Sequence, residues 1–168
     1  MTEPQAESHG DDNAQRPSVR RVAAVLTERG ATGQVRVLPG STRTAAEAAA
    51  ALGCEVGAIA SSLVFDAGGE AVMVITSGAH RVDVAKVAAD HGLAALRRAA
   101  PEFVRAATGQ AIGGVSPVGH PAPIRTLVDR WLARHDQVWA AGGHPHAVFP
   151  TTFEELLALT GSTPVDVE

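Results

Sequence analysis

The sequence predicts a single mixed α/β domain, and three observations support this fold class. Helical and strand patterns are interspersed along 168 residues, a length that suits one domain with one core. Hydrophobic residues make up 45% of the chain and charged residues 19%, as in ordinary globular proteins. A regular strand–helix–strand alternation is missing, which argues against a Rossmann sheet.

The first half of the chain carries clear element boundaries. Residues 1–16 are polar and lack periodicity, which predicts a disordered tail before a domain over residues 17–168. Thr44 and Glu47 have the spacing of a capping box, and Gly53 suits the end of the helix that follows. Two apolar runs separated by a Gly-Gly turn predict a hairpin. The predicted elements are helices over residues 18–30, 45–52 and 84–91 and strands over residues 35–37, 62–66 and 71–76.

The second half is richer in glycine and proline. Pro101 suits the first turn of a short helix that ends before Gly109. Thr152 and Glu155 have the spacing of a second capping box, and Gly161 suits the end of its helix. The predicted elements are helices over residues 102–107 and 153–160 and strands over residues 123–127, 137–141 and 147–150.

Composition restricts the compartment and the partners. No apolar run approaches the roughly 20 residues of a membrane span, and the N-terminus lacks the pattern of a secretory signal. Cys54 is the only cysteine, which fits a reducing compartment, so we expect a cytoplasmic protein without a membrane partner. The formal net charge of −4 does not suggest a dedicated nucleic-acid binder, although local arginine patches permit a transient contact with RNA.

The segment over residues 111–120, AIGGVSPVGH, is the best candidate for a working site. Gly113 and Gly114 let the backbone approach a ligand closely and turn N–H donors toward a carbonyl or oxyanion, while Pro117 stiffens the exit. An isolated Gly-Gly pair is more often a plain structural turn. The segment matches neither a phosphate P-loop nor a nucleophile elbow.

Other side chains offer weaker candidates. His120 borders the glycine segment and is a candidate general base. His144 and His146 have a spacing that could serve a metal, but no third ligand can be placed, so we expect no metal site. Arg97 and Arg98 are candidate phosphate contacts, although exposed arginines more often form a solvated face.

An ordered series of motifs extends this reasoning. The motifs run from TAAEAA (44–49) and LGC (52–54) through IASSLVF (59–65), Gly78 and RVD (81–83) to TGQAIGGVSPVGH (108–120), VWAAGG (138–143), AVFP (147–150) and EELL (154–157). In this order they resemble the YbaK/prolyl-tRNA-synthetase-associated domain over roughly residues 20–168. The resemblance implies a mixed α/β domain with a curved central sheet and flanking helices.

The resemblance also implies an activity. Such domains hydrolyse the ester that joins a wrong amino acid to tRNA, without a cofactor, a metal or a covalent nucleophile, and polarisation and positioning of the carbonyl suffice chemically. The implied partners are the 3′ end of aminoacyl-tRNA and prolyl-tRNA synthetase. The residues carried over by motif are Gly113, Gly114, Ser116 and His120 for catalysis and Ser61, Ser62, Pro117, Gly142, Gly143 and His146 for substrate binding.

Two motif residues differ from the family pattern. The position before Ser-Leu-Val-Phe is normally a lysine and is Ser61 here, and the usual asparagine of the Gly-x-Pro-Asn-Ala-Val-Phe segment is His146. Three hypotheses therefore stay open. The chain is a trans-editing deacylase for alanyl- or cysteinyl-tRNA(Pro), a relative that binds a small ligand, a tRNA end or a protein without catalysis, or an esterase that uses His120.

Overall fold

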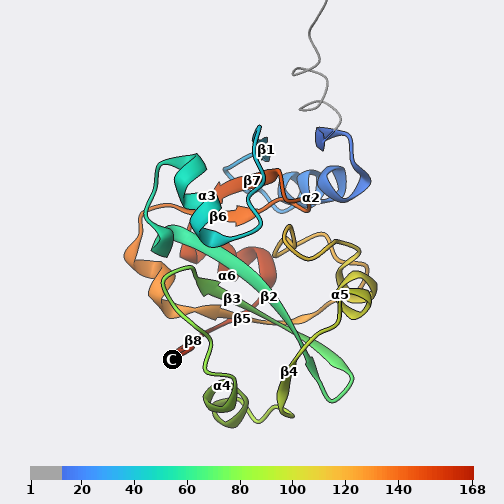
Figure 1. Ribbon diagram of the computed structural model, residues 1–168, viewed down its shortest axis with the longest axis vertical. Coiled ribbons are helices and arrows are strands. Elements are labelled where there is room, and N and C mark those ends of the chain that lie inside the picture. The colour runs from blue at the N-terminus through green and yellow to red at the C-terminus, as the bar shows by residue number, and fades with distance from the viewer. Residues whose placement is uncertain (1–12) are drawn as a thin grey trace, which may run out of the picture.

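The computed structural model describes residues 13–168. Eight strands in this part of the chain form one mixed sheet (Figure 1). Its strands are β1 (Arg36–Val37), β2 (Ile59–Ala67), β3 (Glu70–Ser77), β4 (Leu96–Arg98), β5 (Arg125–Asp129), β6 (Val138–Ala141), β7 (Ala147–Thr151) and β8 (Thr163–Val165). The strand order is β1-β7-β6-β2-β3-β5-β8, and β4 pairs with β2 beside this path. The predicted mixed α/β class is confirmed.

Helices with local end signals surround the sheet. Thr44 and Glu47 form the complete capping box at the start of α3, and Gly53 ends the helix in the left-handed conformation, at φ +68°. Pro101 occupies the first turn of α5. The helices are α2 (Pro17–Glu28), α3 (Ala45–Leu52), α4 (Val84–Asp90), α5 (Pro101–Thr108) and α6 (Phe153–Thr160), with 3₁₀ turns η1 (Val56–Ala58) and η2 (Arg130–Arg134).

The two faces of the sheet bury different clusters. On β3, Met73 and Ile75 join the larger core, which α2, α5 and α6 cover. Val72 and Val74 point to the opposite face and pack with α4 and β8. A third cluster joins α3 to Trp139 and the start of β2. This second face is therefore covered by α3 at one end and by α4 at the other, and β2 crosses the space between them (Figure 1).

The structure extends or corrects several predicted elements. The hairpin forms as expected between β2 and β3, and its turn uses Gly68 and Gly69 at φ +65° and +97°. The second capping box is only half formed: Thr152 caps α6, but the carboxylate of Glu155 binds the Thr151 hydroxyl and the backbone of Thr32. Strands β4 and β8 and the turns η1 and η2 were not among the predicted elements. Most of the predicted disordered tail lies outside the described residues.

Candidate functional site

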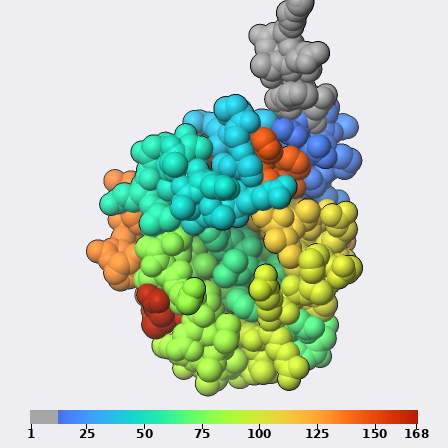
Figure 2. Space-filling model, in the orientation of Figure 1, coloured from blue at the N-terminus to red at the C-terminus, as the bar shows by residue number. Residues whose placement is uncertain are grey.

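A cavity of about 530 Å³ opens on the face of β2 between α3 and β4. Figure 2 shows this face hollowed, with β2 inside the hollow, below residues 38–52 and beside residues 100–115. We call it the β2 cavity. Its lining is mostly aliphatic and aromatic: Arg43, Thr44, Ala45, Ala48, Ile59, Ala60, Ser61, Ser62, Leu63, Val64, Phe65, Arg98, Ala99, Val104, Ile112, Gly113, Val115, Trp139, Ala140, Ala141 and Val148.

The cavity exists because β2 lacks a neighbour along part of one edge. β6 pairs with β2 only at Ile59 and Ala60, and β4 pairs with it only from Phe65 to Ala67. β3 occupies the other edge throughout. Residues 61–64 consequently present an open strand edge, and all four line the cavity. Backbone N–H and C=O groups on such an edge are available to a ligand.

Ser61 and Ser62 bring hydroxyl groups to this edge. Both are half-buried and line the cavity. The Oγ of Ser62 is shielded from solvent and has no hydrogen-bond partner among the described residues. Lys86 does not compensate for the serine at position 61, because it lies on α4 and pairs with Asp90 at 2.5 Å.

The glycine loop, residues 111–120, forms one wall. Gly113 has φ +96° and lines the cavity against the side chain of Arg43. Gly114 packs so closely on the next loop that a Cβ there would lie 2.3 Å from the carbonyl carbon of His144. No hydrogen bond within residues 13–168 uses the N–H of Gly113 or of Val115, which is buried and lines the cavity. The predicted turn is thus tightly packed and also offers unused donors.

Ser116 and His120 stand behind this wall rather than in the cavity. The N–H of Ser116 donates to Oε1 of Gln110 at 2.6 Å, and the Ser116 carbonyl lies 2.8 Å from Nε2 of His120. His120 and Pro117 line a separate cavity of about 240 Å³ on the side of Arg29. Ser116 and His120 therefore do not line the β2 cavity but contact the glycine loop from behind, and their predicted catalytic role stays a prediction.

The environment of His120 disfavours its charged form. Burial lowers the pKa of His120 below its ordinary value of 6.5, and the positive charges of Arg29 and Arg21 act in the same direction. The hydrogen bond with the Ser116 carbonyl has the opposite, smaller effect. A neutral imidazole that donates from Nε2 to this carbonyl fits the geometry.

The turn between β6 and β7 supports the glycine loop from outside the cavity. Gly143 has φ +100°, and its carbonyl accepts a hydrogen bond from the Ser18 hydroxyl of α2 at 2.8 Å. Gly142 donates to the Ala147 carbonyl at 2.7 Å. Nδ1 of His146 lies 3.1 Å from the Leu38 carbonyl. These three predicted binding residues do not line the β2 cavity, and their contact with a substrate stays a prediction.

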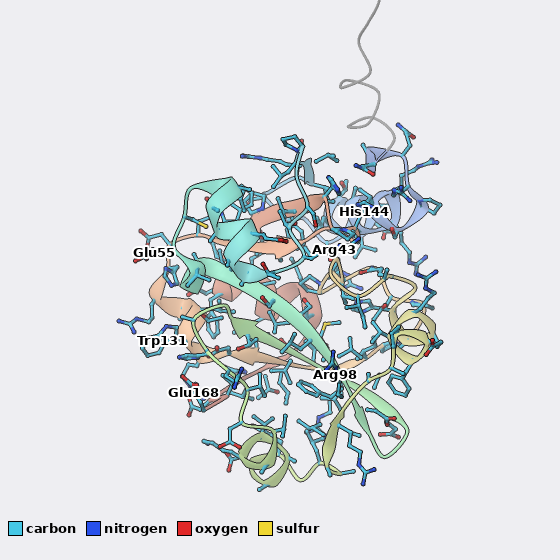
Figure 3. All side chains as sticks on the ribbon, in the orientation of Figure 1. Arg43, Glu55, Arg98, Trp131, His144 and Glu168 are labelled. Atoms are coloured by element: carbon cyan, nitrogen blue, oxygen red, sulfur yellow. The ribbon has the colours of Figure 1, made fainter. Side chains whose placement is uncertain are left out.

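Arg43, Arg98 and Trp139 are site residues that the family motifs did not single out. Arg43 precedes the cap of α3, and Arg98 ends the unpredicted strand β4. Trp139 was part of a recognised motif without an assigned role. Burial lowers the pKa of His144, and the positive charges of Arg16, His146 and Arg43 act in the same direction; Figure 3 shows His144 near Arg43.

Within residues 13–168, no three His, Cys, Asp or Glu side chains are grouped in a way that could hold a metal ion. None of the helices in this part of the chain is long and apolar enough to cross a membrane.

A known protein family and a bacterial protein both match most of this chain. Residues 40–159 match the family model of the aminoacyl-tRNA editing domain. The uncharacterized protein YwhH of Bacillus subtilis (strain 168) is 29% identical over 140 residues, which cover 83% of this chain and 88% of YwhH.

Solved structures share the fold over nearly their whole length. A crystal structure of a candidate trans-editing enzyme for prolyl-tRNA synthetase is 49% identical, covers 91% of this chain and 98% of its own, and superposes with a TM-score of 0.85. A scaffold protein from a study of epitope backbone grafting is 45% identical, with coverage of 90% and 97% and a TM-score of 0.84. The curved mixed-sheet fold that the motifs implied is confirmed by these matches.

Proposed function

Because the chain belongs to the aminoacyl-tRNA editing domain family, we propose that it hydrolyses the ester bond of mischarged tRNA in trans. The observation that carries the proposal is the β2 cavity: it is apolar, it is open to an unpaired strand edge, and one wall holds unused N–H donors. The motif resemblance implies alanyl- or cysteinyl-tRNA(Pro) as the substrates, and the similarity to a candidate trans-editing enzyme for prolyl-tRNA synthetase supports this choice of tRNA.

The glycine loop supplies the electrostatic part of the reaction. Water attacks the carbonyl carbon of the ester, and the negative charge that develops on the carbonyl oxygen faces the N–H groups of Gly113 and Val115. The bond to the ribose oxygen then breaks, and that oxygen takes up the proton released by the water. Such preorganised donors cost no reorganisation during the reaction. The apolar lining suits a small uncharged side chain such as that of alanine or cysteine.

The test is deacylation of a panel of mischarged tRNAs by the purified protein, with release of the labelled amino acid as the readout. We expect turnover of alanyl- or cysteinyl-tRNA(Pro) above the rate in buffer. Loss of ester at the buffer rate for every pair would refute the proposal.

Gly114→Ala tests the role of the loop. The added methyl group would collide with the backbone of His144 at 2.3 Å and displace the donors, so we expect kcat to fall by about 100-fold, the scale of one lost oxyanion donor. Gly40→Ala is the matched control, since a Cβ at Gly40 meets no atom within 4 Å. Unchanged kcat in a folded Gly114→Ala protein would assign catalysis to another part of the cavity.

Ser61 favours one alternative. A cavity that holds a serine in place of the family's lysine could bind a tRNA end, a small ligand or a protein partner without turnover. Equilibrium binding of uncharged tRNA together with deacylation at the buffer rate would select this alternative. Steady turnover that is lost in Gly114→Ala would exclude it.

A further inference from the structure

The β2 cavity has an asymmetric charge. Its charged lining residues are Arg43 and Arg98, and no acidic side chain contributes to the lining. None of the ion pairs among residues 13–168 uses either guanidinium group. The remaining lining is apolar apart from hydroxyl groups. A ligand that matches this lining has an uncharged body and an anionic group at a position that an arginine reaches.

The pairing of β4 with β2 decides which arginine of the Arg97–Arg98 pair faces the cavity. Arg98 lies opposite Phe65, and residues directly opposite each other project on the same side of the sheet. Phe65 lines the cavity, and so does Arg98. Arg97 lies opposite Asp66, projects on the other side and is absent from the lining. Two adjacent, exposed arginines therefore differ in access to the same site.

Arg43 and Arg98 approach the cavity from different ends. The side chain of Arg43 packs on Gly113, beside the donors that we assign to the ester carbonyl. Arg98 lies where β2 meets β4, away from Arg43 and His144 (Figure 3). In a 3′-terminal aminoacyl nucleotide, the ester is on the 2′ or 3′ oxygen of the ribose and the phosphate is on the 5′ oxygen. The two groups thus lie on opposite sides of the sugar.

We propose that Arg98 is a positioning residue that binds the 5′-phosphate of the terminal nucleotide of the substrate. This inference rests on the proposed function, because it takes the ester to lie at the glycine loop. With the ester there, the phosphate extends toward β4, where the planar guanidinium of Arg98 can hold two phosphate oxygens. Arg98 does not touch the reacting atoms; it fixes the ribose so that the ester stays against the loop.

The test compares two small substrates that differ only in the phosphate, alanyl-adenosine and alanyl-AMP with the ester on the ribose. Relative to wild type, Arg98→Ala should lower kcat/KM on alanyl-AMP by about 10- to 100-fold, the size of a charge-assisted hydrogen bond, with most of the change in KM. Its kcat/KM on alanyl-adenosine should stay within about twofold of wild type. Arg98→Lys should recover part of the loss because it keeps the charge.

Arg97→Ala is the matched control. It removes the same charge from the same strand outside the cavity, so kcat/KM should stay within about twofold on both substrates. Equal losses on both substrates in Arg98→Ala, or an equal effect of Arg97→Ala, would overturn the inference. Thermal unfolding of each variant checks that the fold is intact.

Binding provides a readout that does not depend on turnover. Titration calorimetry should show that wild type binds AMP more tightly than adenosine, and that Arg98→Ala abolishes this difference while Arg97→Ala preserves it. Equal affinities of wild type for AMP and adenosine would refute the role of Arg98. If no ester is hydrolysed but the AMP preference depends on Arg98, the proposed function fails and the phosphate site stands.

Discussion

At the scale of single residues, Gln110 shows how the glycine loop keeps its shape. It is 3% exposed, and its two amide atoms bond to opposite sides of the loop. Oε1 accepts from the N–H of Ser116, and Nε2 donates to the carbonyl of Val118 at 3.2 Å. Because a buried amide without partners is unfavourable, this arrangement fixes the loop before any ligand arrives.

His120 should make the stability of the domain depend on pH. Its pKa in the folded protein lies below 6.5, chiefly because of burial, so below about pH 6.5 the unfolded chain binds a proton that the folded protein resists. The free energy of unfolding should therefore fall as the pH drops from 7 toward 5, and the contribution of His120 to this slope should fade out by about pH 8. Urea unfolding at several pH values measures it.

His120→Gln provides the comparison for that slope, since glutamine can still donate to the Ser116 carbonyl but does not titrate. The variant should show a shallower loss of stability between pH 7 and 5 than wild type. An identical slope in His120→Gln and wild type would show that other groups set the pH dependence.

Some residues of the site could be predicted from the sequence, and others could not. Ser61, Ser62 and Gly113 were found because they belong to contiguous motifs, and all three line the cavity. Ser116 and His120 share the same motif but face away from it, since motif membership does not report direction. The sequence marked Arg97 and Arg98 together as candidate phosphate contacts but could not choose between them, because the place of Arg98 in the cavity depends on the pairing of β4 with Phe65, more than thirty residues earlier in the chain.

At the scale of elements, the cap of α6 offers a simple test. The Thr152 side chain accepts from the N–H of Glu155 at 3.0 Å, at the start of a helix that buries Leu156 in the main core. Thr152→Ala should lower the free energy of unfolding by about 1 kcal/mol, the usual loss for an N-cap. Urea unfolding measures the change.

Thr27→Ala is the control for that loss. Thr27 is exposed within α2, and its hydroxyl bonds only to the Ala23 carbonyl of its own helix. Alanine has the higher helix propensity, so this variant should be as stable as wild type or slightly more stable. A loss in Thr27→Ala as large as that in Thr152→Ala would mean that the hydroxyl at residue 152 has no special role.

Local signals predicted the capped helices and even the two-residue strand β1, but they missed β4 and β8. The helices near 45–52, 84–91 and 153–160 have caps and stops that are read within one turn, and all three form. β4 (LRR) and β8 (TPV) show no alternation of apolar and polar residues that would mark a strand. They are strands because β2 and β5 offer them an edge, and that information lies elsewhere in the chain.

At the scale of the whole molecule, the far end of the sheet depends on β8. Val165 and Val167 are each 1% exposed and pack with Leu127 and Val74 on the face that α4 covers. Val165→Ala should lower the free energy of unfolding by about 1.5–3 kcal/mol, from lost burial and the cavity left behind. Thermal or urea unfolding measures the loss.

Val84→Ala is the matched control, because Val84 is 38% exposed and its truncation should change stability by less than about 0.5 kcal/mol. Equal effects at Val84 and Val165 would mean that β8 is peripheral to the folded domain. Deacylation by Val165→Ala at low temperature should match wild type, since β8 is remote from the lining of the β2 cavity.

The parallel pairing of β8 with β5 also has a consequence for synthesis on the ribosome. On the outer edge of β5, Leu127 and Val128 pair with residues 163 and 164 of β8. A nascent chain that has emerged only as far as α6 therefore presents an unfinished apolar edge, the kind of surface on which unrelated chains aggregate. Pairings between distant segments also form slowly. A chaperone that shields β5 until residues 163–167 emerge would raise the yield of folded protein without changing its stability.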